Sequence, residues 1–297
     1  MLRKLLSWAS PTGPKARLSV LIFHRVLPEP DPLFPEEMHA QRFDELCGWL
    51  AYLFNVLPLD QAVEHLKAGT LPARAACITF DDGYADNHNI ALPILQRHGL
   101  CATFFIATGF LNGGRMWNDT IIETVRRRVD LPTIASRQAA IKTLINQIKY
   151  LPTAERVTMT EELAQAAGVT LPQDLMMTSD QVKAMRKAGM QIGAHTVSHP
   201  ILARLTDDEA RQQIGDSKHF LENLLGERVG LIAYPNGKPG EDYSPATVEV
   251  VRSLSFDAAV STQWGASKLG DDLLQIRRFT PWDKTRLRFG VRLLRNL

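Results

Sequence analysis

The sequence predicts an α/β fold built on a parallel sheet, and three observations lead to this prediction. Short apolar runs alternate with helical apolar periodicity along most of the 297-residue chain, a pattern typical of strands joined by crossover helices. Polar residues that can bind metal or move protons directly follow three of these runs, at His24, Asp81 and His195. Residues 112–177 interrupt the alternation with helical patterns alone. We therefore expect one large α/β body with a helical insertion.

The first half of the chain shows a regular succession of elements. Apolar periodicity and flanking Gly residues predict, in order, a strand over 18–23, helices over 41–53 and 60–67, a strand over 77–80, a helix over 90–97 and a strand over 102–107. Because strands and helices alternate, parallel pairing with right-handed crossovers is expected.

The second half resumes the succession after the insertion. Thr178 with Gln181, and Thr206 with Glu209, have the spacing of capping boxes that begin helices. These helices are expected to end at Gly189 and Gly226. Strands are predicted over 189–194, 229–233, 256–260 and 274–279.

Charge divides the chain into an acidic body, residues 18–283, and two basic ends, residues 1–17 and 284–297. In the C-terminal segment apolar and basic residues interleave, so it is expected either to pack on the body as a helix or to lie on an anionic membrane surface. The sequence contains no apolar run of membrane-spanning length, no signal-peptide pattern and no nucleic-acid-binding module. The odd number of cysteines, without CxxC spacing, favours a reducing cytoplasm.

Two short motifs carry the chemistry. Asp81 and Asp82 end one predicted strand, and His195 and His199 follow another. One carboxylate and two imidazoles suit a catalytic divalent metal with an open position, and the second carboxylate is free to accept a proton. At the carboxyl ends of parallel strands, such residues converge on one site.

These residues resemble a known family. Thr79-Phe80-Asp81-Asp82-Gly83 and His195-Thr196-Val197-Ser198-His199-Pro200 match the first two motifs of the polysaccharide deacetylases, also called the NodB-homology family or carbohydrate esterase family four. Ala233-Tyr234-Pro235-Asn236-Gly237 resembles the third motif. The resemblance covers approximately residues 18–283. It implies a distorted (β/α)7 barrel that removes acetyl groups from N-acetylated sugars.

The resemblance also implies a role for each matching residue. Asp82, His195 and His199 would bind a divalent metal, Asp81 would act as the general base, and the Asn236 backbone N–H would help to hold the oxyanion. The nucleophile would be a water molecule on the metal. This ligand set suits Zn²⁺, although other first-row divalent ions are compatible with it.

The chain departs from the family pattern at two points. Many members have an arginine where this chain has Ala233, and that arginine pairs with the base; Arg277 or Arg278 could substitute for it. Many members also have a C-terminal histidine as general acid, whereas no histidine follows His219 here. His24, at the end of the first predicted strand, is the candidate replacement.

Several residues near the expected barrel rim are candidates for sugar contact: Tyr84, Trp117, Pro235 and Trp264. The expected partner is an N-acetylated glycan or a lipid-linked glycan precursor, and the expected location is the cytoplasm, with peripheral contact at the inner membrane face if the basic ends bind lipid. Two alternatives stay open: a catalytically inactive carbohydrate-binding or scaffold protein on the same fold, and a hydrolase of a non-sugar amide.

Overall fold

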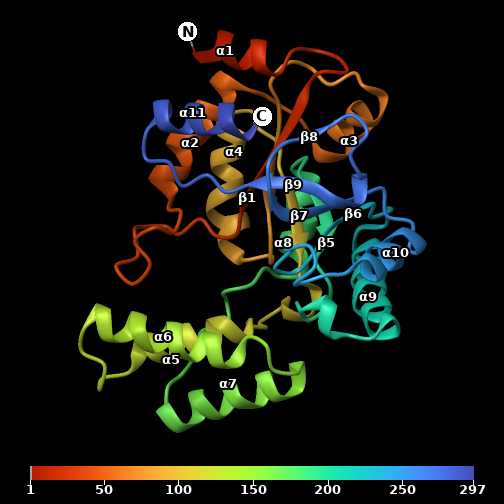
Figure 1. The fold of residues 1–297 in the computed structure, drawn as a ribbon. Helices are drawn as coiled ribbons and strands as arrows, with labels where there is room; N and C mark the ends of the chain where they lie inside the picture. Colours follow the sequence, from red (N-terminus) through yellow and green to blue (C-terminus); the bar gives the residue numbers. More distant parts are fainter. Residues whose placement is uncertain (1) are drawn as a thin grey trace.

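Seven parallel strands close into a barrel in the computed structural model, which describes residues 2–297 (Figure 1). The barrel strands are β1 (Arg17–Phe23), β3 (Ala75–Phe80), β4 (Thr103–Ile106), β5 (Gln191–Ala194), β6 (Leu231–Ala233), β7 (Ala258–Trp264) and β9 (Ile276–Phe279). They pair in chain order, and β1 closes the ring by pairing with β3 on one side and β9 on the other. Two short strands pair with members of the ring, β2 (Asn55–Val56) with β3 and β8 (Ser267–Lys268) antiparallel with β1. The predicted distorted (β/α)7 barrel is confirmed.

Helices cover the outside of the barrel and form the connections between its strands (Figure 1). The helices of the barrel body are α2 (Ala40–Leu53), α3 (Leu59–Ala68), α4 (Leu92–Arg97), α8 (Ser179–Lys187), α9 (Asp207–Leu225) and α10 (Pro245–Ser253). Both predicted capping boxes are present, at the starts of α8 and α9. Helix α10 was not predicted, although Ser244 and Thr247 form a capping box at its start as well.

An aromatic row fixes which way the strand ends point. Phe23, Phe80 and Phe104 are register neighbours on β1, β3 and β4. The Phe80 ring stacks on both neighbours, at centroid distances of 5.1 Å and 4.8 Å, and also contacts Phe43 of the outer helix α2. Successive side chains on a strand point to opposite faces. Because Phe80 points outward against α2, the residue that follows it, Asp81, points into the barrel mouth.

The insertion between β4 and β5 is helical, as predicted. It contains α5 (Trp117–Arg127), α6 (Ile134–Ile148) and α7 (Thr153–Ala167), which lie together at one end of the barrel (Figure 1). These helices share a small apolar core that includes Ile121, Val125, Ile141 and Ile148. The insertion therefore forms a separate layer over the mouth where the strands end.

The two basic ends of the chain form helices that pack together. Helix α1 (Leu2–Ala9) contacts α11 (Arg286–Asn296), and both contact α2 (Figure 1). Helix α11 buries Phe289 and Leu293, and a Cβ atom at Gly290 would lie only 2.2 Å from Leu2 Cδ2, so glycine permits this close approach. Two arrangements were predicted for the C-terminal segment, a helix packed on the body or a helix on a membrane surface, and the observed packing agrees with the first. Within residues 2–297, no helix has the length and apolar character needed to cross a bilayer.

Candidate active site

The carboxyl ends of the barrel strands bring the predicted polar residues into one cavity of about 260 Å³. Asp81 and Asp82 follow β3, His195 follows β5, and Asn236 follows β6. The lining of this cavity includes residues from the barrel and from the helical insertion: His24, Asp81, Asp82, Met116, Trp117, Asn118, Ile145, Lys149, Arg156, His195, His199, Asn236 and Thr262. The site therefore lies between the barrel mouth and the layer above it.

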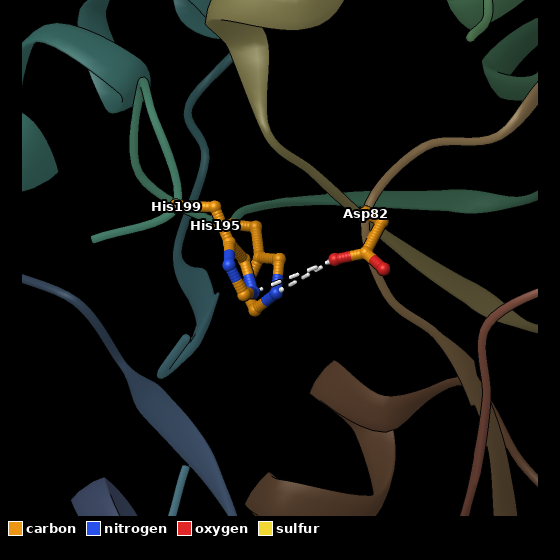
Figure 2. A group of neighbouring side chains, drawn as sticks. All are labelled: Asp82, His195 and His199. Atoms are coloured by element: carbon orange, nitrogen blue, oxygen red, sulfur yellow. Dashed lines mark ion pairs between the residues drawn. The ribbon is translucent and has the colours of Figure 1, made fainter. Parts of the chain in front are cut away.

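Asp82, His195 and His199 have the geometry of a metal-binding cluster. Their candidate ligand atoms all lie within 4.8 Å of one another, and Figure 2 shows both imidazole rings facing the carboxylate. Asp82 Oδ1 lies 3.4 Å from His195 Nε2 and 3.5 Å from His199 Nε2. Zinc bonds of about 2.0–2.2 Å place tetrahedral ligands roughly 3.4 Å apart, so the observed spacing fits such an ion.

The hydrogen bonds around the cluster also fit a metal. His195 Nδ1 donates to the Ala233 carbonyl oxygen at 2.8 Å, which leaves the Nε2 lone pair directed at the site. Asp82 Oδ1 is buried and has no hydrogen-bond partner within residues 2–297. Burial lowers the pKa of His199 to about 4, so this imidazole is neutral at pH 7. Burial alone would raise the pKa of Asp82, but the two histidines hold it well below its usual range.

Asp81 is paired with a buried arginine. Arg278 on β9 donates from Nη1 and Nη2 to the two carboxylate oxygens of Asp81, each at 2.7 Å, and from Nε to the Ser261 carbonyl oxygen. Both partners are buried, with side-chain exposures of 0% for Arg278 and 4% for Asp81. Burial would raise the pKa of Asp81, but the Arg278 charge reverses the shift and keeps this carboxyl ionised. The structure thus brings together Asp81 and Arg278, whereas Arg277 packs beside Gly265.

Backbone conformation at the site is strained. Within residues 2–297, four of the seven non-glycine residues with positive φ lie in the two motifs and the third-motif loop, namely Asp82 (75°), Thr196 (64°), His199 (51°) and Asn236 (56°). Such conformations cost of order 1–3 kcal/mol each and persist where surrounding contacts hold them. Thr196 Oγ1 accepts a hydrogen bond from the His199 backbone N–H, which holds this turn. Two consecutive residues of a regular strand point to opposite faces, but the positive φ of Asp82 breaks the strand geometry, so that both aspartates can serve one site.

Asn236 offers a backbone donor at the cavity wall. Its N–H donates to no acceptor within residues 2–297. Its carbonyl oxygen accepts a hydrogen bond from Thr262 Oγ1 at 2.8 Å, and this bond fixes the loop. A free N–H held in place at a cavity wall is suited to binding a developing negative charge.

His24 is exposed at the end of β1, and its side chain forms no hydrogen bond within the described part of the chain. It lines the cavity that contains Asp81 and also two neighbouring cavities, one beside α6 and one beside Asp119. Its imidazole therefore faces open space where these cavities meet.

The four sugar-contact candidates are placed differently. Trp117 lines the cavity with Asp81, and Tyr84 lines the adjacent cavity, where its hydroxyl donates to Asp119 Oδ1 at 3.2 Å. Pro235 is buried and Trp264 is exposed at the end of β7, and neither lines the cavity at Asp81. Of the four candidates, only Trp117 and Tyr84 line a cavity that contains Asp82.

The lining residues that were not predicted from the sequence include three polar ones: Lys149, Arg156 and Thr262. Lys149 and Arg156 lie in the insertion, where neither motif nor strand end marks a position as part of the site. Thr262 stands one residue after Ser261 on β7. Its only sequence signal is a polar residue near the end of a predicted strand, which is too common to single it out.

Comparison with known proteins agrees with the geometry. The family model described as Polysaccharide deacetylase matches residues 68–259, more than half of the chain. YxkH of Bacillus subtilis strain 168 is 21% identical over 274 residues, covering 92% of this chain and 74% of that protein. The Streptococcus pyogenes deacetylase PplD, solved with acetate, is 20% identical with a TM-score of 0.65, covering 95% of this chain and 98% of that one. IcaB from Ammonifex degensii is 19% identical with the same TM-score and the same coverage. At these identities the structural likeness concerns the fold.

Proposed function

The chain belongs to the polysaccharide deacetylase family, and from this premise we propose that it hydrolyses the N-acetyl group of an N-acetylated sugar in a polysaccharide or glycan precursor. The reaction consumes one water and yields acetate and a free amine on the sugar. The observation that carries the proposal is the ionised, buried Asp81, held by Arg278 beside the three-residue cluster of Asp82, His195 and His199.

Asp82, His195 and His199 would hold a divalent metal, and their nitrogen and oxygen atoms suit zinc, with other first-row ions as alternatives. When bound, such an ion polarises an amide carbonyl and lowers the pKa of water. The neutral His199 and the ionised Asp82 are the protonation states that metal binding requires.

Asp81 would take the proton from the attacking water. Arg278 keeps this carboxylate ionised and fixes its orientation through two hydrogen bonds, so that it can act as a base without rearranging. The free N–H of Asn236 would donate to the oxygen that becomes negative as the carbonyl is attacked.

Departure of the amine requires a proton donor, because an amide anion is a very poor leaving group. We assign this step to His24, since it lines the cavity with Asp81 and its side chain is free of protein partners within residues 2–297. The guanidinium groups at the site cannot supply a proton at neutral pH.

An inactive binding protein on the same fold is less well supported than an enzyme. That alternative depended on two absences, the arginine of the third motif and the C-terminal histidine. Arg278 makes the expected contact with Asp81 from a different strand, and His24 lines the same cavity. A hydrolase of a non-sugar amide would use the same residues, so the choice of substrate separates it from the proposal.

Acetate release tests the function directly. Wild type and Asp81→Asn would be incubated with N-acetylated oligosaccharides, and bound metal would be measured by elemental analysis in both. We expect acetate from wild type, a loss of at least about 100-fold in the variant, and equal metal in both. Bound metal with no acetate from any glycan, but hydrolysis of a small non-sugar acetamide, would favour the second function.

A cytoplasmic location, with contact between the basic ends and an anionic membrane face, stays a prediction. The membrane contact is supported by the exposure of two apolar side chains close to basic residues such as Arg286: Trp8 on α1 is 84% exposed and Leu287 on α11 is 69% exposed. Co-sedimentation with phosphatidylglycerol vesicles, compared for wild type and Leu287→Glu, measures this contact.

A further inference from the structure

Arg156 is a buried cation in the active-site cavity without a counter-charge. It lies on α7 with 3% exposure and lines the cavity that contains Asp82. Within residues 2–297 its guanidinium forms no ion pair or hydrogen bond with a carboxylate or carbonyl group, and Nε is buried without a partner. The guanidinium group lies over the Trp117 ring, with its carbon 5.1 Å from the ring centroid.

A second cation faces the same cavity. Lys149, at the end of α6, lines the cavity and is half-buried, with Nζ 5.5 Å from the centroid of the exposed Tyr150 ring, and it forms no ion pair within the described residues. The carboxylates of the cavity do not balance these two charges, because Asp81 is already paired with Arg278 and Asp82 alone is left to face both cations. The cavity therefore has an excess of positive charge on the side formed by the insertion.

Burial without a partner is among the most unfavourable situations for a charged group. Burial lowers the pKa of Arg156, although a guanidinium keeps its charge at neutral pH. A contact with the face of Trp117 compensates only part of this loss. A buried cation of this kind is stable where another group supplies the counter-charge. A cavity open to substrate can admit an anion that does so.

We propose that Arg156 and Lys149 form an anion-binding subsite, which selects sugars that carry a carboxylate or phosphate close to the N-acetyl group. This inference rests on the proposed deacetylase function and names its substrate class. A guanidinium binds two oxygens of either anion in parallel, and an ammonium adds a point charge. Arg156 also lines the next cavity, together with Ser198, so the subsite would be accessible from both cavities.

The test compares three substrates that share the N-acetylated sugar. A neutral N-acetylglucosamine oligomer, an oligosaccharide containing N-acetylmuramic acid, and N-acetylglucosamine 1-phosphate differ in having no anion, a carboxylate or a phosphate. Acetate release would be measured for wild type, Arg156→Gln and Lys149→Met. The matched control is Lys142→Met, because Lys142 is exposed on the same helix α6 and lines a different cavity.

We expect Arg156→Gln to lower kcat/KM about 10- to 100-fold for an anionic substrate, the usual effect of losing a charge-assisted hydrogen bond. Lys149→Met should lower it about 3- to 10-fold. The neutral substrate should change by less than about 3-fold, and Lys142→Met should change none of the three. The anionic substrate that responds more strongly identifies the group as carboxylate or phosphate.

Two outcomes overturn the inference while leaving the deacetylase function intact. Equal losses on neutral and anionic substrates would mean that Arg156 only holds α7 in place or contacts the product acetate. No loss in either variant would mean that no anion is bound. If wild type releases no acetate from any substrate, the proposed function fails, and binding of the three sugars to wild type and Arg156→Gln decides the inference separately: equal binding refutes it. Because Lys149→Met leaves the contact between Arg156 and Trp117 intact, it tests the subsite even if Arg156→Gln disturbs the insertion.

Discussion

Replacing Arg278 with methionine removes the partner of Asp81 while nearly preserving volume. The pair is buried on both sides and linked by two hydrogen bonds of 2.7 Å. Removing one partner of a buried pair leaves an uncompensated charge and typically destabilises a protein by about 3–5 kcal/mol. We expect this loss in the free energy of unfolding at pH 8, measured by urea denaturation.

The loss should depend on pH, with a defined sign. In wild type the pKa of Asp81 lies below its usual range because Arg278 outweighs burial. Wild-type Asp81 thus stabilises the fold above the unfolded pKa, and this contribution is lost as pH falls through the folded pKa. Without Arg278, burial raises the pKa of Asp81, so the variant loses stability as pH rises above about 4. The difference between the two proteins should therefore grow from roughly 1–3 kcal/mol near pH 4, where a neutral carboxyl has lost only hydrogen bonds, to its full size at pH 8.

The pH dependence of kcat/KM should shift in the same direction as the pKa of Asp81. A base with a raised pKa is protonated over more of the pH range, so the acid limb of kcat/KM should move to higher pH in Arg278→Met. At pH 7 we expect a loss of about 100-fold, the lower end of what a positioned base contributes. The loss should shrink as pH rises, because deprotonation restores the base.

The neighbouring Arg277 is the matched control, because its side chain packs beside Gly265 instead of contacting Asp81. Arg277→Met should keep the wild-type pH profile and most of the stability. The double variant Arg278→Met/Asp81→Asn should be more stable at pH 8 than Arg278→Met alone, because it has no stranded charge. The reasoning is refuted if Arg278→Met and Arg277→Met have the same stability and the same acid limb.

Three further predictions concern other groups at the site. His199→Ala should abolish the stabilisation by added Zn²⁺, which for an intact site is about 2.7 kcal/mol at 100 times the dissociation constant, as measured by thermal unfolding. His24→Ala should retain metal in elemental analysis but lower kcat by roughly 100-fold or more, since it removes the proton donor. Burial raises the pKa of Asp119 to about 7, so the native state binds the extra proton between pH 4 and 7, and wild type loses stability as pH rises through this window. In chelator-treated protein, Asp119→Asn should become more stable than wild type by roughly 2–4 kcal/mol at pH 8, with little difference at pH 4.

Each of these predictions has a clear contrary result. The exposed His219 on α9 is the control for His199, and an equal zinc response in His199→Ala and His219→Ala would remove His199 from the ligand set. Unchanged turnover in His24→Ala would exclude it as the acid. A stability difference between Asp119→Asn and wild type that does not vary with pH would show that Asp119 is ionised throughout the range.

The barrel was predictable because its strands are short apolar runs that end in recognisable polar residues. The predicted strand over 77–80 ends, as does β3, at Phe80, and the polar motif follows at once. The ends of other elements were less visible: β6 starts at Leu231, two residues later than predicted, and β7 continues to Trp264. Helix α1 was missed because it has only eight residues and its apolar face is covered by α11 and α2, which lie far away in the sequence.

The proximity of Asp81, Asp82, His195 and His199 could be predicted because they occur as two pairs of sequence neighbours, each following a predicted strand. The partner of Asp81 could be narrowed only to Arg277 or Arg278, since the choice depends on which of two successive strand residues points inward. In the structure, Arg278 is the one that points inward. Arg156 and Lys149 could not be predicted, because their place at the site follows from how the insertion folds over the barrel and from no local pattern.

The position of Arg278 on the closing strand has a consequence for the synthesis of the chain. Asp81 and Arg278 are separated by 197 residues, and the strand that bears the arginine is the last to join the barrel in chain order. At translation rates of about 5–20 residues per second, roughly 10–40 s pass between the emergence of the two partners from the ribosome. During this interval the aspartate has neither its counter-charge nor its orientation. The nascent protein therefore completes the Asp81–Arg278 pair in a single late step, when β9 is added between β7 and β1.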